Sequence, residues 1–180
     1  MDYYIVFAGI IEQGFGNRLL NAVNNATQQG AKKIILLFSS LGGSTQEGFT
    51  LASVIQNCKI PISIHATNNI DSIANVIYLS AKERTAESYA KFYMHGATTQ
   101  GIFDEKGLNE QLLAVKTEST RIAYFISENC SLDLQKVQNM MKTGTSITAQ
   151  QALQCGIVQA INHLEIPPKG VLREDIVIIN

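Results

Sequence analysis

The chain has 180 residues, of which 46% are hydrophobic and 16% are charged, and its formal net charge is -1. This length and composition predict one globular domain with a substantial core, and they exclude a disordered chain. The near-neutral charge, with no run of Lys or Arg, argues against nucleic acid or an anionic membrane as a partner. The three cysteines, Cys58, Cys130 and Cys155, form no C-x-x-C pair, so we expect reduced thiols with neither a disulfide framework nor a metal site.

Targeting signals are not evident in the sequence. Residues 1–4 lack the cationic region of a signal peptide, and no apolar run approaches the roughly 20 residues needed to span a membrane. We therefore expect a cytoplasmic protein.

The first part of the chain alternates between strand and helix patterns. Three segments rich in β-branched and aromatic side chains are predicted to be buried strands: 3–9, 32–40 and 61–66. Two segments are predicted to be helices: 17–29, whose apolar residues fall on one side, and 45–57. A polar loop at 68–71 then leads into another helical pattern that begins at Ser72. This alternation predicts a mainly parallel sheet with right-handed crossovers and helices packed against it.

The second part of the chain is more helical. A strand is predicted at 88–95, followed by a polar segment and a long amphipathic helix over 108–127. Shorter helices are predicted at 132–141 and 148–154, with a strand at 157–161 and a short β-prone tail at 175–180. We expect a single domain over residues 1–165, with a tail from 166 to 180.

Ser72 lies where a polar loop meets an apolar helical pattern. Backbone N–H groups point outward at a helix start and the helix dipole is positive there, so a serine at this place suits an N-cap. The same surroundings also suit a nucleophile that attacks a carbonyl carbon. The two interpretations share one residue, and the rest of the chain decides between them.

A serine nucleophile requires a base and donors for the oxyanion. His65 lies inside a strand pattern and His163 in the C-terminal connection, so both are interpreted as structural or exposed. His95 ends a predicted strand, and parallel sheets place ligands at the carboxyl ends of their strands, so His95 is the candidate base. Gly43, after another strand, and Ile73, after the serine, are the candidate oxyanion amides.

These residues together resemble the Clp protease proteolytic subunit. The resemblance rests on Ser39-Ser40-Leu41-Gly42-Gly43, on Ser72 at a helix start, on Tyr93-Met94-His95, and on Thr148-Ala149-Gln150-Gln151-Ala152 with Gly156-Ile157-Val158. It covers about residues 3 to 162. It implies a crotonase-like spiral of ββα units with a protruding handle helix, placed at about 96–130. It also implies a serine endopeptidase with Ser72 as nucleophile, His95 as base, and Gly43 and Ile73 as oxyanion donors, without metal or cofactor.

The sequence departs from the family pattern at the third catalytic residue. The position of the triad aspartate falls on Thr143-Gly144-Thr145, where no carboxylate stands, and Leu41 replaces a proline. Three alternatives follow. Thr143, Thr145 or a backbone carbonyl orients His95; a displaced acid does so; or the protein is a ring-forming pseudoenzyme with a structural or regulatory role. The candidate displaced acids are Asp71, which we interpret as a helix N-terminal charge, and the solvated Asp104 and Asp133.

The resemblance further implies partners. Peptides or unfolded proteins are the expected substrates, and a ring of identical subunits is the expected assembly. An ATP-dependent unfoldase is a conceivable partner, but the family's segment before the first strand is nearly missing here, which does not favour its docking. The chain has no P-loop, so any ATP dependence would come from another chain.

Overall fold

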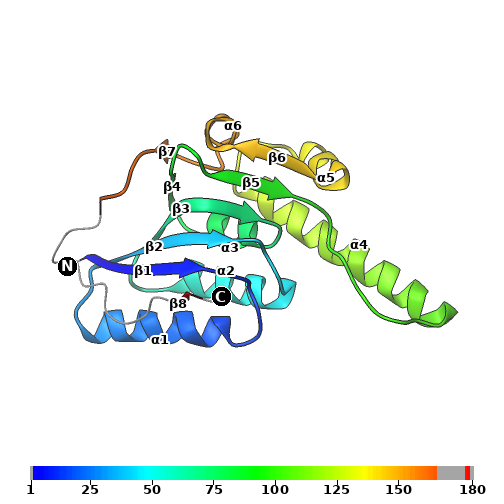
Figure 1. Cartoon of the computed structure of the whole chain (residues 1–180), viewed down its shortest axis with the longest axis horizontal. Helices are drawn as coiled ribbons and strands as arrows, with labels where there is room; N and C mark the ends of the chain where they lie inside the picture. Colours follow the sequence, from blue (N-terminus) through cyan, green and yellow to red (C-terminus); the bar gives the residue numbers. More distant parts are fainter. Residues whose placement is uncertain (1, 166–176, 179–180) are drawn as a thin grey trace.

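The computed structural model describes residues 2–165 and 177–178 (Figure 1). In this part of the chain an eight-stranded sheet has the order β6-β5-β3-β2-β1-β8, with β4 paired to β3 and β7 paired to β4. The strands are β1 (Asp2–Ala8), β2 (Lys33–Ser40), β3 (Ile62–Asp71), β4 (Glu83–Ala86), β5 (Lys91–Met94), β6 (Thr145–Thr148), β7 (Ala160–Ile161) and β8 (Val177–Ile178). All pairings are parallel except that of β5 with β6.

Six helices in the described part of the chain accompany the sheet, and one of them projects away from it (Figure 1). They are α1 (Phe15–Gln28), α2 (Thr45–Asn57), α3 (Ala74–Ser80), α4 (Glu105–Glu128), α5 (Leu134–Thr143) and α6 (Ala149–Gln154). α3 packs against α2 and α4, and Figure 1 shows α4 projecting away from the body of the molecule. None of the helices in the described part of the chain is long and apolar enough to cross a membrane.

The core explains why the apolar segments fold as predicted. Alternate residues of β2, Ile34, Leu36 and Phe38, have no exposed surface, and all seven residues of α3 are buried. The predicted mainly parallel α/β architecture is therefore confirmed, and the helix predicted at 45–57 has those bounds. The strand predicted at 88–95 is confirmed only over β5, the one at 157–161 only over β7, and the pattern did not indicate β4 or β6.

The polar segment at 68–71 is not a loop, contrary to the sequence prediction. β3 continues through it to Asp71, because its last residues pair with β5: Asn69 with Lys91, Ile70 with Phe92, and Asp71 with Tyr93. Their backbone hydrogen bonds are satisfied by a strand that comes later in the chain, and Ile70 fills the core. This extension carries the chain to Ser72 in a defined position.

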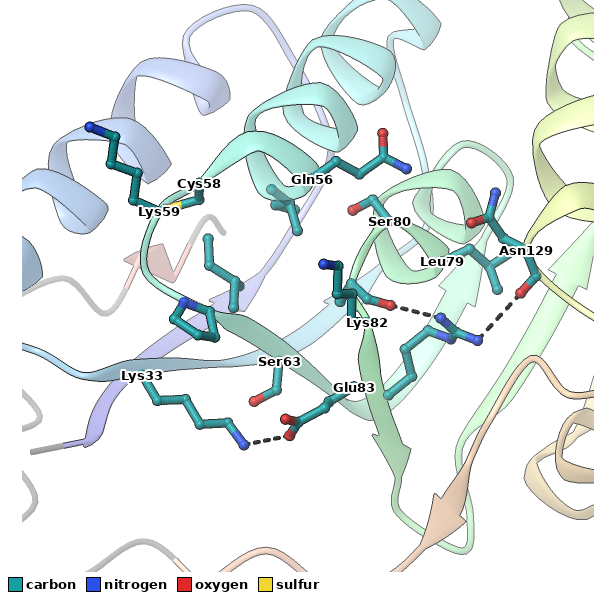
Figure 2. A pocket seen from close by; sticks show the side chains of 15 residues that line it. Lys33, Gln56, Cys58, Lys59, Ser63, Leu79, Ser80, Lys82, Glu83 and Asn129 are labelled. Atoms are coloured by element: carbon teal, nitrogen blue, oxygen red, sulfur yellow. Dashed lines mark hydrogen bonds and ion pairs between the residues drawn. The ribbon is translucent and has the colours of Figure 1, made fainter.

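Carbonyl groups surround Arg84 of β4, which is one of the residues that line the pocket drawn in Figure 2. The buried guanidinium donates to the carbonyls of Ala81 (2.7 Å), Ile157 (2.9 Å), Gly156 (3.3 Å) and Asn129 (3.3 Å). It borders a cavity of about 690 Å³, which the C-terminal ends of α2 and α3 also line. Helix C-termini carry partial negative charge, and the basic side chains that line this cavity offset the charge at the ends of α2 and α3. They are Lys33, Lys59, Lys82 and Arg84.

A second buried polar cluster lies on β3 and β4. His65 Nδ1 bonds Thr85 Oγ1 at 2.7 Å, and its Nε2 lies 3.3 Å from Glu87 Oε1, which also contacts His163 Nδ1 at 3.0 Å. Burial lowers the pKa of His65, with Glu87 opposing that effect. Burial alone would raise the pKa of Glu87, but hydrogen bonds from His65, the Leu164 backbone and His163 bring it below its ordinary value. Both shifts make the fold more stable at neutral pH than in acid.

We expect this cluster to make stability fall as the pH is lowered. A histidine whose pKa is lowered on folding is protonated more readily in the unfolded chain, so stability is lost as the pH falls below the ordinary value of 6.5. Glu87 adds a further loss below its ordinary value of 4.5. Thermal unfolding between about pH 7.5 and 5 should therefore show a smaller decrease for His65→Gln than for the wild type. His163→Gln is the control, because that side chain is 76% exposed; equal slopes for the wild type and His65→Gln would contradict the assignment.

Candidate active site

Ser72 forms a strained turn between β3 and α3. Its φ is +59°, and among the described residues it is the only one other than glycine with a positive φ. Such a conformation costs an L-residue roughly 1–2 kcal/mol, so the surrounding structure must hold it. The Ser72 amide donates to the carbonyl of Tyr93 at 2.8 Å, and the Ser72 carbonyl accepts from the Asn75 amide at 3.1 Å. The N-cap of α3 is Ile73, so the interpretation of Ser72 as the N-cap is wrong.

Asn75 supports this turn and was not identified from the sequence. Its side-chain amide donates to the carbonyls of Ile70 (3.1 Å), Ser72 (3.1 Å) and Tyr93 (2.9 Å), and the residue is completely buried. The one available signal was an amide side chain inside the apolar run 73–79. Asn75 thereby joins the end of β3, the turn and the end of β5.

Two glycines follow β2, and the first of them, Gly42, lies beside the serine. Gly42 has a φ of +96°, and a Cβ built on it would lie 2.6 Å from the Cβ and 3.2 Å from the Oγ of Ser72. Gly43 is held by a bridge to Ile11, whose carbonyl accepts from the Ser44 amide at 2.7 Å. Gly42 therefore brings bare backbone against the candidate nucleophile.

The amides of Gly43 and Ile73 remain available at this place. In the described part of the chain, the backbone hydrogen bonds of loops, turns and caps include no bond donated by either amide. Gly43 directly follows Gly42, which lies against Ser72, and Ile73 directly follows Ser72. Unpaired amides adjoining these two residues suit the stabilisation of a developing oxyanion.

His95 directly follows β5, the strand whose Tyr93 pairs with Asp71 of β3. The sheet therefore brings the strand ends that lead to His95 and Ser72 to neighbouring positions. His95 Nδ1 lies 2.7 Å from the carbonyl oxygen of Gly96, and the imidazole stacks on the Tyr93 ring with centroids 5.1 Å apart and planes at 28°. Because a carbonyl oxygen only accepts, Nδ1 carries the proton and Nε2 is the basic nitrogen of the neutral ring.

The two threonines proposed to orient His95 bond elsewhere. Thr143 Oγ1 donates to the Asn139 carbonyl at 3.0 Å and lies 2.9 Å from Thr145 Oγ1. Between them, Gly144 has a φ of +66°, and a Cβ there would lie 2.9 Å from the hydroxyl of Tyr93. The Tyr93 phenol thus occupies space that a side chain at position 144 would need.

Among the three displaced acids, only Asp71 lies at this site. Asp104 and Asp133 accept hydrogen bonds from the amides of Gly107 and Lys136 and cap α4 and α5. Asp71 ends β3 and is 8% exposed, so its interpretation as a helix N-terminal charge is wrong. Its Oδ1 has no hydrogen-bond partner among the described residues.

The charge state of Asp71 reflects its surroundings. Burial raises the pKa of the Asp71 carboxyl, while electrostatic interactions with Lys91 and with His95 and a backbone hydrogen bond from Tyr93 lower it. A buried carboxylate thus lies close enough to His95 for their charges to interact. No group of three His, Cys, Asp or Glu side chains within residues 2–165 and 177–178 is placed to hold a metal ion.

The fold and the site define an α/β protein with a serine in a strand-to-helix turn and a histidine after the neighbouring strand. The Clp protease family model matches residues 2–165, so the chain belongs to the Clp protease family. Its structure is similar to that of a point mutant of ClpP1 from Listeria monocytogenes, with a TM-score of 0.81 and 17% identity over 89% of this chain and 91% of that one. At this identity the likeness shows the fold. No curated protein matches the sequence.

The close approach of Gly42 to Ser72 gives a testable consequence. We expect Gly42→Ala to lower the free energy of unfolding more than Gly30→Ala does. Both positions have a positive φ, +96° and +74°, so both carry the strain of roughly 1–2 kcal/mol, but only position 42 also places the new methyl group against Ser72. Nothing lies within 4 Å of a Cβ at position 30. Denaturant unfolding of both variants measures the difference, and equal losses would show that Gly42 is required for its φ alone.

Proposed function

We propose that this member of the Clp protease family is a serine peptidase that cleaves peptide bonds through an acyl-enzyme on Ser72. The observation that carries the proposal is the left-handed turn of Ser72, whose amide donates to the Tyr93 carbonyl in β5, the strand that directly precedes His95. Strain at a single residue other than glycine is typical of functional sites, where it presents a side chain in one direction. A structural N-cap would not require it.

In the proposed reaction, His95 Nε2 removes the proton from Ser72 Oγ as the oxygen attacks the carbonyl carbon of the scissile peptide. The tetrahedral intermediate carries its negative charge on the former carbonyl oxygen, and the amides of Gly43 and Ile73 donate to it. The protonated His95 then gives its proton to the leaving amine. A water molecule, deprotonated by the same imidazole, hydrolyses the ester and releases Ser72.

The Gly96 carbonyl supports the assignment of His95 as base. It accepts the Nδ1 proton at 2.7 Å and so selects the tautomer in which Nε2 is basic, which is one task of a triad aspartate. A neutral carbonyl stabilises the imidazolium less than a hydrogen-bonded carboxylate does. We propose that Asp71 supplies the missing negative charge from the end of β3, without a direct hydrogen bond to the ring.

A catalytically weak or inactive ring-forming protein is the second candidate. The lack of a carboxylate at Thr143-Gly144-Thr145, beside which the Tyr93 phenol fills the space, favours it. The exposed apolar side chains on and before α4 favour assembly under either candidate, and we propose that they pack against other copies of this chain. They are Ile102, Leu108, Leu112, Leu113 and Tyr124.

Active-site labelling distinguishes the two candidates. We expect a fluorophosphonate probe to modify Ser72, to fail with Ser72→Ala, and to react more slowly at neutral pH with His95→Gln, since the serine then lacks its base. Intact-mass and peptide mass spectrometry identify the modified residue. Ser44 and Ser80 in the same chain are internal controls for nonspecific reaction. Absence of labelling at Ser72 in folded wild type, under conditions that label a known serine peptidase, would leave the inactive ring protein as the better description.

Asp71→Asn removes the charge of this side chain and keeps its shape. Since burial raises the pKa of this carboxyl, the ionised form costs stability above its pKa, and Asp71→Asn should raise the melting temperature at neutral pH. The gain should vanish as the pH falls toward the ordinary value of 3.8, where the wild-type acid is neutral.

The same variant should acylate Ser72 more slowly, by less than the roughly 10⁴-fold loss that follows when a triad aspartate is blocked. Lys91→Met is the matched control for a general electrostatic effect, because it removes a positive charge that interacts with the Asp71 carboxyl. If Asp71→Asn became more stable and reacted at the wild-type rate, Asp71 would have no part in the chemistry.

A further inference from the structure

The side chain of Asn75 lies in an apolar helix, yet it donates hydrogen bonds to three backbone carbonyls outside that helix. Its amide group has two N–H bonds but reaches three carbonyl oxygens, those of Ile70, Ser72 and Tyr93, at 2.9 to 3.1 Å. One N–H is therefore shared between two acceptors. The three carbonyls belong to β3, to the strained turn and to β5, so one side chain spans all the segments that meet at the site.

The turn is held by Asn75 from two directions. The Ser72 carbonyl accepts both the backbone amide and the side-chain amide of Asn75, each at 3.1 Å. With its carbonyl fixed by two donors and its amide bonded to Tyr93, Ser72 cannot relax to a negative φ without breaking several buried hydrogen bonds. Strained residues persist only where the surroundings determine them in this way.

The carbonyl oxygen of the Asn75 side chain does not contribute to stability in the same way. Among the described residues, Asn75 Oδ1 is buried without any hydrogen-bond partner. A buried acceptor left unpaired is unfavourable, and an apolar residue would avoid that penalty in a helix whose other residues are buried. An asparagine at this position therefore costs stability through its unpaired oxygen. Such a cost is expected where its N–H groups hold the residues of the site in place.

We propose that Asn75 is a positioning residue that holds Ser72 in its left-handed conformation and couples it to the strand that ends in His95. The effect of Asn75 on the stability of the turn follows from the geometry alone. Its effect on the reactivity of Ser72 rests on the proposed function. Asn75 does not touch the substrate in this proposal. It acts through the Ser72 and Tyr93 carbonyls.

A double-mutant cycle on stability tests the mechanical part. Ser72→Gly removes the penalty for a positive φ, so it should raise the melting temperature of the wild type. In an Asn75→Ala background the turn is free to relax, and Ser72→Gly should no longer give this increase. Asn129→Ala is the control background, because the Asn129 side chain also donates to a carbonyl, that of Phe125 at 2.7 Å, but at the end of α4. There the increase from Ser72→Gly should persist.

Two results of this cycle would overturn the inference. One is no increase from Ser72→Gly in the wild type, which would mean that the turn stores no strain. The other is an equal increase in the wild-type and Asn75→Ala backgrounds, which would mean that Asn75 does not hold it. If Asn75→Ala does not fold, Asn75→Ser takes its place, since it retains one donor but is too short to reach three carbonyls.

The kinetic part uses the same variants below their melting temperatures. We expect Asn75→Ala and the isosteric Asn75→Asp, which loses the donors, to reduce the rate of Ser72 acylation by fluorophosphonate by about tenfold or more, because small misplacements of a nucleophile are costly. Asn129→Ala should react at the wild-type rate. Wild-type rates in folded Asn75 variants would overturn the inference. A wild type that is not labelled at all would instead refute the proposed function, and the stability cycle would still decide the role of Asn75.

Discussion

The change of partner along β3 is the constraint on which the site depends. Ser63 to Ala66 pair with β4, and Asn69 to Asp71 pair with β5, so one strand joins two neighbours in succession. Beside them, the pairing of β2 with β3 shifts register between Phe38 and Ser40. Because β5 pairs only with the last part of β3, its end, and thus His95, falls next to the residue that follows β3. The position of Ser72 relative to its proposed base is therefore a property of sheet register.

The same pairing shapes the electrostatics of the site. Asp71 lies opposite Tyr93, and the Tyr93 ring stacks on the imidazole of His95. Asp71 therefore comes close to His95 from the strand that carries the serine, whereas position 144, on the far side of β5, is a glycine beside the Tyr93 hydroxyl. A side chain at position 144 and the Tyr93 phenol would compete for the same space.

Local patterns predicted those parts of the molecule that local interactions decide. The apolar run of β2 and the helix α2 are visible in the sequence, and their predicted bounds were close to the observed ones. The polar end of β3 was misjudged because Asn69 becomes strand only through pairing with Lys91, far along the chain. Ser72 was identified from its position between two patterns. Its backbone angle, which argues most strongly for function, leaves no trace in composition or periodicity.

Buried polar groups are fully paired at one place in the sheet and left partly unpaired at another. Around β4, the carbonyls that Arg84 reaches accept its hydrogen bonds, and His65 of the neighbouring β3 is bonded through both ring nitrogens. Around the turn between β3 and α3, Asp71 and Asn75 each bury an oxygen that has no partner in the described part of the chain, beside a residue with a strained φ. These costs are offset by the apolar core, to which every residue of α3 but Asn75 and Ser80 contributes a buried apolar side chain. A substitution that relieves them should therefore stabilise the protein while it disturbs the site, which is the behaviour expected when strain and unpaired polarity serve a reaction.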